Sequence, residues 1–115
     1  MREILEGEHF VERSNSEVES LDKCAMKAAK DKDEVERLIK EFQPYLRGQV
    51  HHYTGSDNRN EDELFSSALT AFYEAIISYD AKKGHFFPFA KKVVGLRLID
   101  CMRKIYRTQQ NVISL

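Results

Sequence analysis

The sequence predicts an all-α fold, a compact bundle of three to five helices. Apolar residues recur every three or four positions through most of the chain, and several of these segments begin with a helix-capping signal. Segments that alternate apolar and polar residues, as strands do, are almost absent. No repeat or low-complexity tract divides the 115 residues, so we expect one helical domain at residues 16–107, between a flexible arm at residues 1–15 and a tail at residues 108–115.

A short amphipathic helix is expected at the start of this domain. Ser16 and Glu19 have the spacing of a capping box, and the helix should end near Lys30. Its apolar face comprises Val18, Leu21, Ala25 and Ala28.

A longer second helix begins with the same signal, since Asp31 is followed by Glu34. Pro44 interrupts this helix, and because proline removes a backbone donor and crowds the preceding turn, a kink or a break is expected there. The segment TGSDNRNED that follows has the composition of a loop. The apolar stripe of this helix comprises Val35, Leu38, Ile39, Phe42, Leu46, Val50 and Tyr53.

The third helix has the clearest periodic pattern in the chain. Asn60 and Glu63 offer another N-cap pair at its start. The wide apolar face that follows comprises Leu64, Phe65, Ala68, Leu69, Phe72, Ala75, Ile76 and Tyr79.

A last helix is expected from Phe86 to Ile105, after a loop that Gly84 supplies. Its apolar positions extend nearly all round. Pro88 suits the first turn of this helix, where a missing backbone donor costs little.

Charge is strongly segregated along the chain, although the formal net charge is only -1. Residues 1–42 carry 8 basic and 12 acidic side chains, residues 43–80 carry 2 and 6, and residues 81–115 carry 8 and 1. The last third could therefore attract a polyanion. The alternative is a solvated basic helix that pairs with the acidic helices of the same domain.

Aromatic rings and cations stand together before and within the last helix. Rings can stack on unpaired bases while cations hold the phosphate backbone, which is what binding to single-stranded nucleic acid requires. The rings are those of Phe86, Phe87 and Phe89, and the cations are Lys82, Lys83, His85, Lys91 and Lys92.

The three phenylalanines could equally belong to the core. Burying one Phe side chain contributes roughly 1.5–3 kcal/mol, and stacking on a base contributes roughly 1–3 kcal/mol, so energy alone does not decide. We expect Phe89 in the core, on an apolar stripe with Val93. One of Phe86 and Phe87 should be exposed, because both lie beside the glycine turn.

Four segments in this order resemble region 2 of the sigma-70 family of bacterial transcription initiation factors, and most closely its sigma-I branch. They are ALTAFYEAIISYD, KKG, FPFA and LRLIDCMRK, and the likeness extends over about residues 17–107. The resemblance implies an alternative sigma factor that binds core RNA polymerase, recognises and melts the -10 promoter element, and is held inactive by a membrane-anchored anti-sigma factor. It also implies a second DNA-reading domain, so we expect the chain to be the N-terminal domain of a longer factor.

The resemblance assigns DNA contacts to the turn and the last helix. The family approaches bases or phosphates from positions that match Phe89, Lys91, Lys92, Leu96 and Arg97. Primary sigma factors carry two tryptophans where this chain has Lys92 and Val93, so the melting wedge of those factors is absent and a stricter promoter choice is implied. Further basic candidates are Arg103, Lys104 and Arg107, which could instead complement the dipole at the C-terminus of the helix.

The resemblance also assigns a docking role, onto a coiled coil in the largest subunit of core RNA polymerase. The alternative for each of these positions is an ordinary helix surface. The matching residues are Gln43, Leu46, Glu63, Ser66, Ser67, Leu69 and Tyr73.

Other classes of function find little support in the sequence. His51 and His52 are adjacent on a helix and lack a partner four residues away, so no metal site is expected, and no cofactor motif or catalytic constellation is present. Cys24 and Cys101 lack metal-ligand spacing and should be small buried hydrophobes. No run of apolar residues is long enough to span a bilayer, so we expect a cytoplasmic protein. Because no catalytic constellation is present, we do not expect an enzyme. The alternative function is a helical interaction module that binds an acidic protein partner without contacting DNA.

Overall fold

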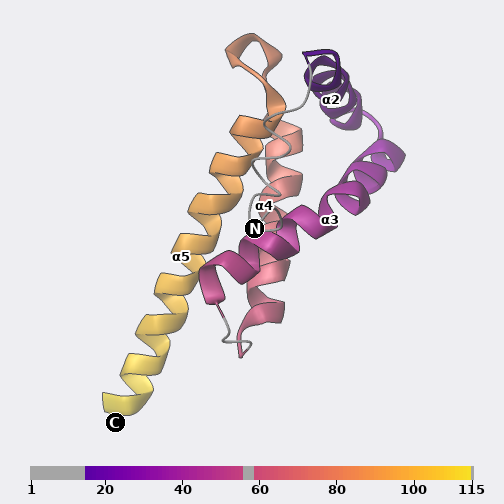
Figure 1. Ribbon diagram of the computed structural model, residues 1–115. Coiled ribbons are helices and arrows are strands. Elements are labelled where there is room, and N and C mark those ends of the chain that lie inside the picture. The colour runs from indigo at the N-terminus through magenta and orange to yellow at the C-terminus, as the bar shows by residue number, and fades with distance from the viewer. Residues whose placement is uncertain (1–14, 56–58, 115) are drawn as a thin grey trace.

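The structure of the protein, a computed structural model, describes residues 15–55 and 59–114, with side chains described between residues 19 and 108 (Figure 1). These residues form four α-helices, a single 3-10 turn and no strand, which confirms the predicted all-α fold. The elements are α2 (Asn15–Ala28), α3 (Lys32–Thr54), α4 (Glu61–Ser78), η2 (Ala81–Lys83) and α5 (Phe86–Ser114). The predicted arm lies outside the described residues, apart from Asn15 at the start of α2.

Helices α4 and α5 run antiparallel beside each other, and α3 crosses them (Figure 1). Helix α2 packs near the end of the bundle where α4 turns into α5, and it contacts all three other helices. Helix α5 is the longest element among the described residues and projects past the others at its C-terminal end (Figure 1). It continues to Ser114, beyond the predicted end at Ile105 and through the segment expected to be a tail.

Helix α3 begins where the capping signal predicted, because the side chain of Asp31 accepts a hydrogen bond of 3.0 Å from the amide of Asp33. Of the kink or break expected at Pro44, the break is wrong, since α3 is one element from Lys32 to Thr54. Pro44 is exposed, while its neighbours Phe42 and Tyr45 are buried. The packing of these rings on both sides of the proline holds the helix together despite the missing backbone hydrogen bond.

The core lies between the four helices, and α4 contributes six buried residues. Three of its buried residues are alanines, which let the neighbouring helices approach closely. The predicted faces of α2, α3 and α4 are confirmed for the buried residues Leu21, Ala25, Ala28, Val35, Leu38, Phe42, Leu46, Val50, Leu64, Ala68, Phe72, Ala75 and Ile76. Partly buried members of these faces are Ile39, Tyr53, Phe65, Leu69 and Tyr79.

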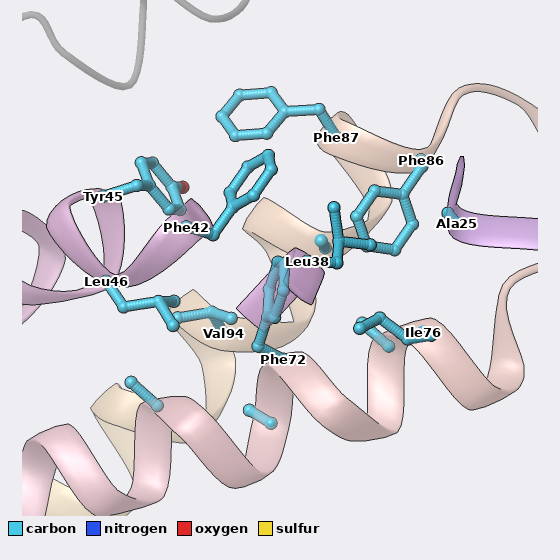
Figure 2. Close-up of a cluster of buried hydrophobic side chains, with 14 of the residues drawn as sticks. Ala25, Leu38, Phe42, Tyr45, Leu46, Phe72, Ile76, Phe86, Phe87 and Val94 are labelled. Atoms are coloured by element: carbon cyan, nitrogen blue, oxygen red, sulfur yellow. The ribbon is translucent and has the colours of Figure 1, made fainter. Parts of the chain in front are cut away.

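The first turn of α5 is anchored by two aromatic rings (Figure 2). Phe86 is 0% exposed and Phe87 is 5% exposed, so the prediction that one of them faces solvent is wrong. The Phe86 ring meets Phe72 edge to face at 5.7 Å, and the Phe87 ring meets Tyr45 in the same way at 5.1 Å. These contacts lie across three helices, and this explains why both rings are buried although they follow a glycine turn.

The connection between α4 and α5 is short and well defined. The side chain of Asp80 accepts a hydrogen bond of 2.9 Å from the amide of Lys82, which starts η2. The backbone φ angle of Gly84 is 138°, a value that glycine adopts without a steric penalty. Gly84 thus allows the chain to reverse direction before α5 begins at Phe86.

Candidate nucleic-acid interface

Five of the predicted DNA-binding residues are exposed at the turn and in the first half of α5. We call these five residues the basic surface. Lys82 and Lys83 lie in η2, and His85 directly precedes α5. The basic surface comprises Lys82, Lys83, His85, Lys91 and Lys92.

An open groove between α3 and α5 borders the basic surface. It has a volume of about 390 Å³ and is lined by Gln49, Tyr53, Pro88, Lys91, Lys92, Gly95, Leu96 and Ile99. The two lysines and Leu96 were predicted to bind DNA, whereas the residues from α3 were not. Tyr53 was assigned to the apolar stripe of α3, and only the crossing of α3 over α5 shows that its half-buried ring borders the groove.

Residues further along α5 divide between two flanks of the helix. Lys92, Leu96 and Arg103 are separated by four and seven positions, so they lie on one exposed face, and Leu96 is 59% exposed. Arg97 and Lys104 lie on the other flank.

Both cations on that second flank take part in ion pairs. Arg97 pairs with Glu74 of α4, and Lys104 pairs with Asp100 at 3.6 Å. The structure therefore does not bring all the predicted cations to one surface.

The three phenylalanines differ in how far their rings are exposed for stacking on a base. Phe86 and Phe87 fill the core, so the prediction that they stack on bases is contradicted by their burial. Phe89 is partly buried, and its ring centroid lies 6.3 Å from that of Tyr79. Phe89 is thus the one member of the predicted trio that keeps part of its ring at the surface.

The predicted docking residues on α4 divide into an exposed face and a buried one. Glu63, Ser66 and Tyr73 are exposed on one face, which continues to Ile77, and Tyr73 and Ile77 are 47% and 48% exposed. Leu69 is partly buried at the border of this face.

Two of the predicted docking residues face other helices of the domain. Leu46 is 0% exposed, so its assignment as a partner contact is wrong, because the crossing of α3 over α4 closes over it. The hydroxyl of Ser67 donates to the sulfur of Cys101 at 3.4 Å and therefore faces α5. Gln43 on α3 is half-buried.

A contact between α3 and α4 that the sequence did not suggest borders the exposed face of α4. The guanidinium carbon of Arg47 lies 4.0 Å from the centroid of the Phe65 ring, in a cation–π arrangement. Arg47 itself is exposed. Nothing in the local pattern of either helix pairs these two residues, since the contact depends on how the helices cross.

The cysteines and histidines among the described residues do not gather into a further site. Cys101 is buried, as predicted, whereas Cys24 is only partly buried, and both thiols are free. Within residues 15–55 and 59–114, no three His, Cys, Asp or Glu side chains gather as a metal site would need. None of the helices in that part of the chain combines the length and the apolar character that crossing a bilayer requires.

Comparison with known proteins shows which proteins this chain is similar to. The chain is 45% identical over 71 residues to RNA polymerase sigma factor SigI1 of Acetivibrio thermocellus, a match that covers 59% of this chain and 27% of that protein. It is 37% identical over 81 residues to SigI8 of the same organism, covering 69% of this chain and 31% of SigI8. It is 32% identical over 83 residues to SigI of Bacillus subtilis, covering 71% of this chain and 33% of that protein.

The helical domain with its basic surface is thus similar to one region of the RNA polymerase sigma factors named SigI. This similarity confirms the predicted resemblance to the sigma-I branch. The chain spans about a third of the length of the curated relatives it matches. No family model matches the chain, and no solved structure matches it.

Proposed function

We propose that this chain is the N-terminal domain of an alternative sigma factor, which binds core RNA polymerase and the -10 element of a promoter. The observation that carries the proposal is the similarity to sigma-I factors. The surface of the domain is consistent with it, because the exposed face of α4 and the basic surface at α5 belong to different elements. The domain can therefore contact the polymerase and the promoter at the same time.

The basic surface and the neighbouring groove are proposed to hold the melted non-template strand. Lysines contact phosphates without reading sequence, so they supply affinity, while the groove and the exposed Leu96 give bases an apolar contact. Because Phe86 and Phe87 are buried in the core, we assign base stacking to Phe89 and to Tyr53, whose ring borders the groove.

Regulation by a membrane-anchored anti-sigma factor is part of the proposal, supported by the resemblance to the sigma-I branch. The partner would hold the factor inactive until released. A sigma factor would act in the cytoplasm, where the promoter and the polymerase are.

Co-purification with core RNA polymerase tests the docking part of the proposal. Tyr73→Ala should reduce the amount of polymerase retained, because Tyr73 is 47% exposed on the face of α4 assigned to docking. Tyr106→Ala is the matched control, since Tyr106 is 62% exposed but lies on α5. Absence of binding by the unaltered chain, or equal retention by both variants, would count against the docking role.

The second candidate is a helical interaction module that binds an acidic protein partner and no DNA. The burial of Phe86 and Phe87 favours it, because a basic surface with fewer rings is less specialised for bases. Titration of single-stranded oligonucleotides at several salt concentrations separates the two. Binding that weakens linearly in logarithmic salt supports DNA binding, and absence of oligonucleotide binding supports the interaction module.

A further inference from the structure

One carboxylate on α2 links that helix to the turn that precedes α5. Oδ1 of Asp22 accepts a hydrogen bond of 2.8 Å from the backbone amide of Phe86, the first residue of α5. Oδ2 of Asp22 lies 2.7 Å from Nδ1 of His85. The Asp22 side chain is only 15% exposed, so both contacts are partly shielded from water.

The first contact has the chemistry of an N-cap supplied by a distant helix. The first amides of an α-helix have no acceptor within the helix, and an acidic group there also complements the helix dipole. An N-cap residue normally precedes its own helix in sequence. Asp22 instead precedes Phe86 by 64 positions and belongs to a separate element, so the cap couples α2 to α5.

The position of Asp22 is fixed by the packing of α2. Leu21, Ala25 and Ala28 are buried in the shared core, on either side of Asp22 along the helix. Because α2 is short, this apolar face is what holds the helix to the bundle. Displacing α2 would remove the cap from α5.

Tyr79 also contacts the turn and the first residue of α5. The Tyr79 hydroxyl donates a hydrogen bond of 2.8 Å to the carbonyl oxygen of Gly84, and its ring meets the Phe86 ring edge to face at 5.3 Å. Burial raises the pKa of Tyr79 to about 12, and the negative charge of Asp22 adds to that shift. Tyr79 and Asp22 thus belong to one cluster around the start of α5.

We propose that Asp22 is a positioning residue, through which the docking of α2 fixes the turn that carries Lys82 and Lys83. The turn cations then keep a defined place relative to Lys91 and Lys92 on α5. This positioning role rests on the proposed function, which assigns the basic surface to the binding of single-stranded DNA. The link between Asp22 and the start of α5 stands on the two contacts alone.

Amide hydrogen exchange measured residue by residue tests the link. Asp22→Ala should speed exchange at the Phe86 amide by about tenfold, the change expected when a capping bond is removed. Asp22→Asn should restore most of the protection, because its side-chain oxygen can still accept from Phe86. Unchanged exchange at Phe86 in Asp22→Ala would overturn the proposal.

Asp31→Ala is the matched control for stability. Asp31 caps α3 through the amide of Asp33, so this variant also loses one acidic cap but leaves the start of α5 intact. At conditions that equalise the global stability of the two variants, only Asp22→Ala should show faster exchange at Phe86. Equal exchange in the two variants would mean that general destabilisation explains the effect, and would overturn the proposal.

Binding of a single-stranded oligonucleotide tests the consequence for function. Asp22→Ala should weaken binding by about threefold to tenfold relative to Asp31→Ala, because the turn lysines lose their fixed positions. Equal affinity of these two variants would overturn the positioning role. If the unaltered chain does not bind the oligonucleotide, the proposed function fails, and the exchange experiment still decides whether Asp22 caps α5.

Discussion

The rings of Tyr45 and Phe87 lie 5.1 Å apart, edge to face, inside the core and not at a DNA-facing surface. Tyr45 is on α3, and Phe87 is in the first turn of α5. Their contact joins two helices beside the proposed interface, so the position of the lysines on α5 depends on a buried aromatic pair. Phe87, which the sequence suggested as a base-stacking residue, is therefore a core residue that influences where the lysines on α5 lie.

Substitution of Phe87 should act on stability. Phe87→Ala is expected to lower the free energy of unfolding by about 3–5 kcal/mol, because it removes a buried ring and leaves a cavity. Phe89→Ala should cost less, since Phe89 is only partly buried. Urea unfolding of both variants measures the difference, and a cost for Phe87→Ala no larger than that for Phe89→Ala would contradict the burial of Phe87.

Two glycines should respond to alanine in opposite ways. Gly84 has φ 138, where a side chain is strained, so Gly84→Ala should destabilise the protein by about 1–3 kcal/mol. Gly95 is inside α5, and an added Cβ would lie 3.5 Å from the Tyr53 hydroxyl oxygen, an ordinary contact. Gly95→Ala should therefore stabilise by about 0.5–1 kcal/mol through helix propensity. Thermal unfolding of the pair checks the signs, and a loss of stability in Gly95→Ala would show that the groove does not accommodate the methyl group.

The lysines of the basic surface should control the salt dependence of DNA binding. The double variant Lys91→Ala/Lys92→Ala should bind single-stranded oligonucleotide more weakly, with a slope of log K against log salt reduced by about 0.7 for each phosphate that is no longer neutralised. Lys30→Ala/Lys32→Ala removes the same charge from two exposed positions, one just after α2 and one at the first residue of α3, and is the control. Equal slopes in the two double variants would exclude a specific role for the lysines on α5.

Alkaline pH should weaken the fold through its partly and fully buried tyrosines. The pKa of Tyr79 rises from 10 to about 12, because of burial and then the charge of Asp22, and burial also raises the pKa of Tyr45. The folded state then holds these protons more tightly than the unfolded state does. The stability that the neutral hydroxyls contribute is complete below about pH 10 and is lost as the pH rises through the folded pKa values.

The phenylalanine variant at Tyr79 isolates one of these contributions. Urea midpoints of the unaltered chain should fall between about pH 10 and pH 12, and those of Tyr79→Phe should fall less steeply because that variant has no proton to lose there. Parallel curves for the two proteins would show that Tyr79 ionises alike in the folded and unfolded states.

Local patterns predicted much of the fold because helical periodicity is a property of neighbouring residues. The apolar face of α4 and the Asp31 cap of α3 follow from spacings of three and four positions, which one helix satisfies by itself. The similarity to sigma-I factors was also predicted, from four segments in a fixed order. Of the two alternatives at Pro44, a kink or a break, the break was wrong because packing by Phe42 and Tyr45 outweighs the local preference of proline.

The site was less predictable, because the exposure of a side chain depends on what crosses over it. The order of residues was enough to predict that rings and cations stand together around Gly84 and that the third helix has one wide apolar face. The packing of the helices was needed to show that α3 buries Phe87, that the start of α5 is capped by Asp22, and that Arg97 pairs with Glu74. Each of these contacts joins residues more than twenty positions apart, and their geometry is set by the angles at which whole helices pack, which no short segment encodes.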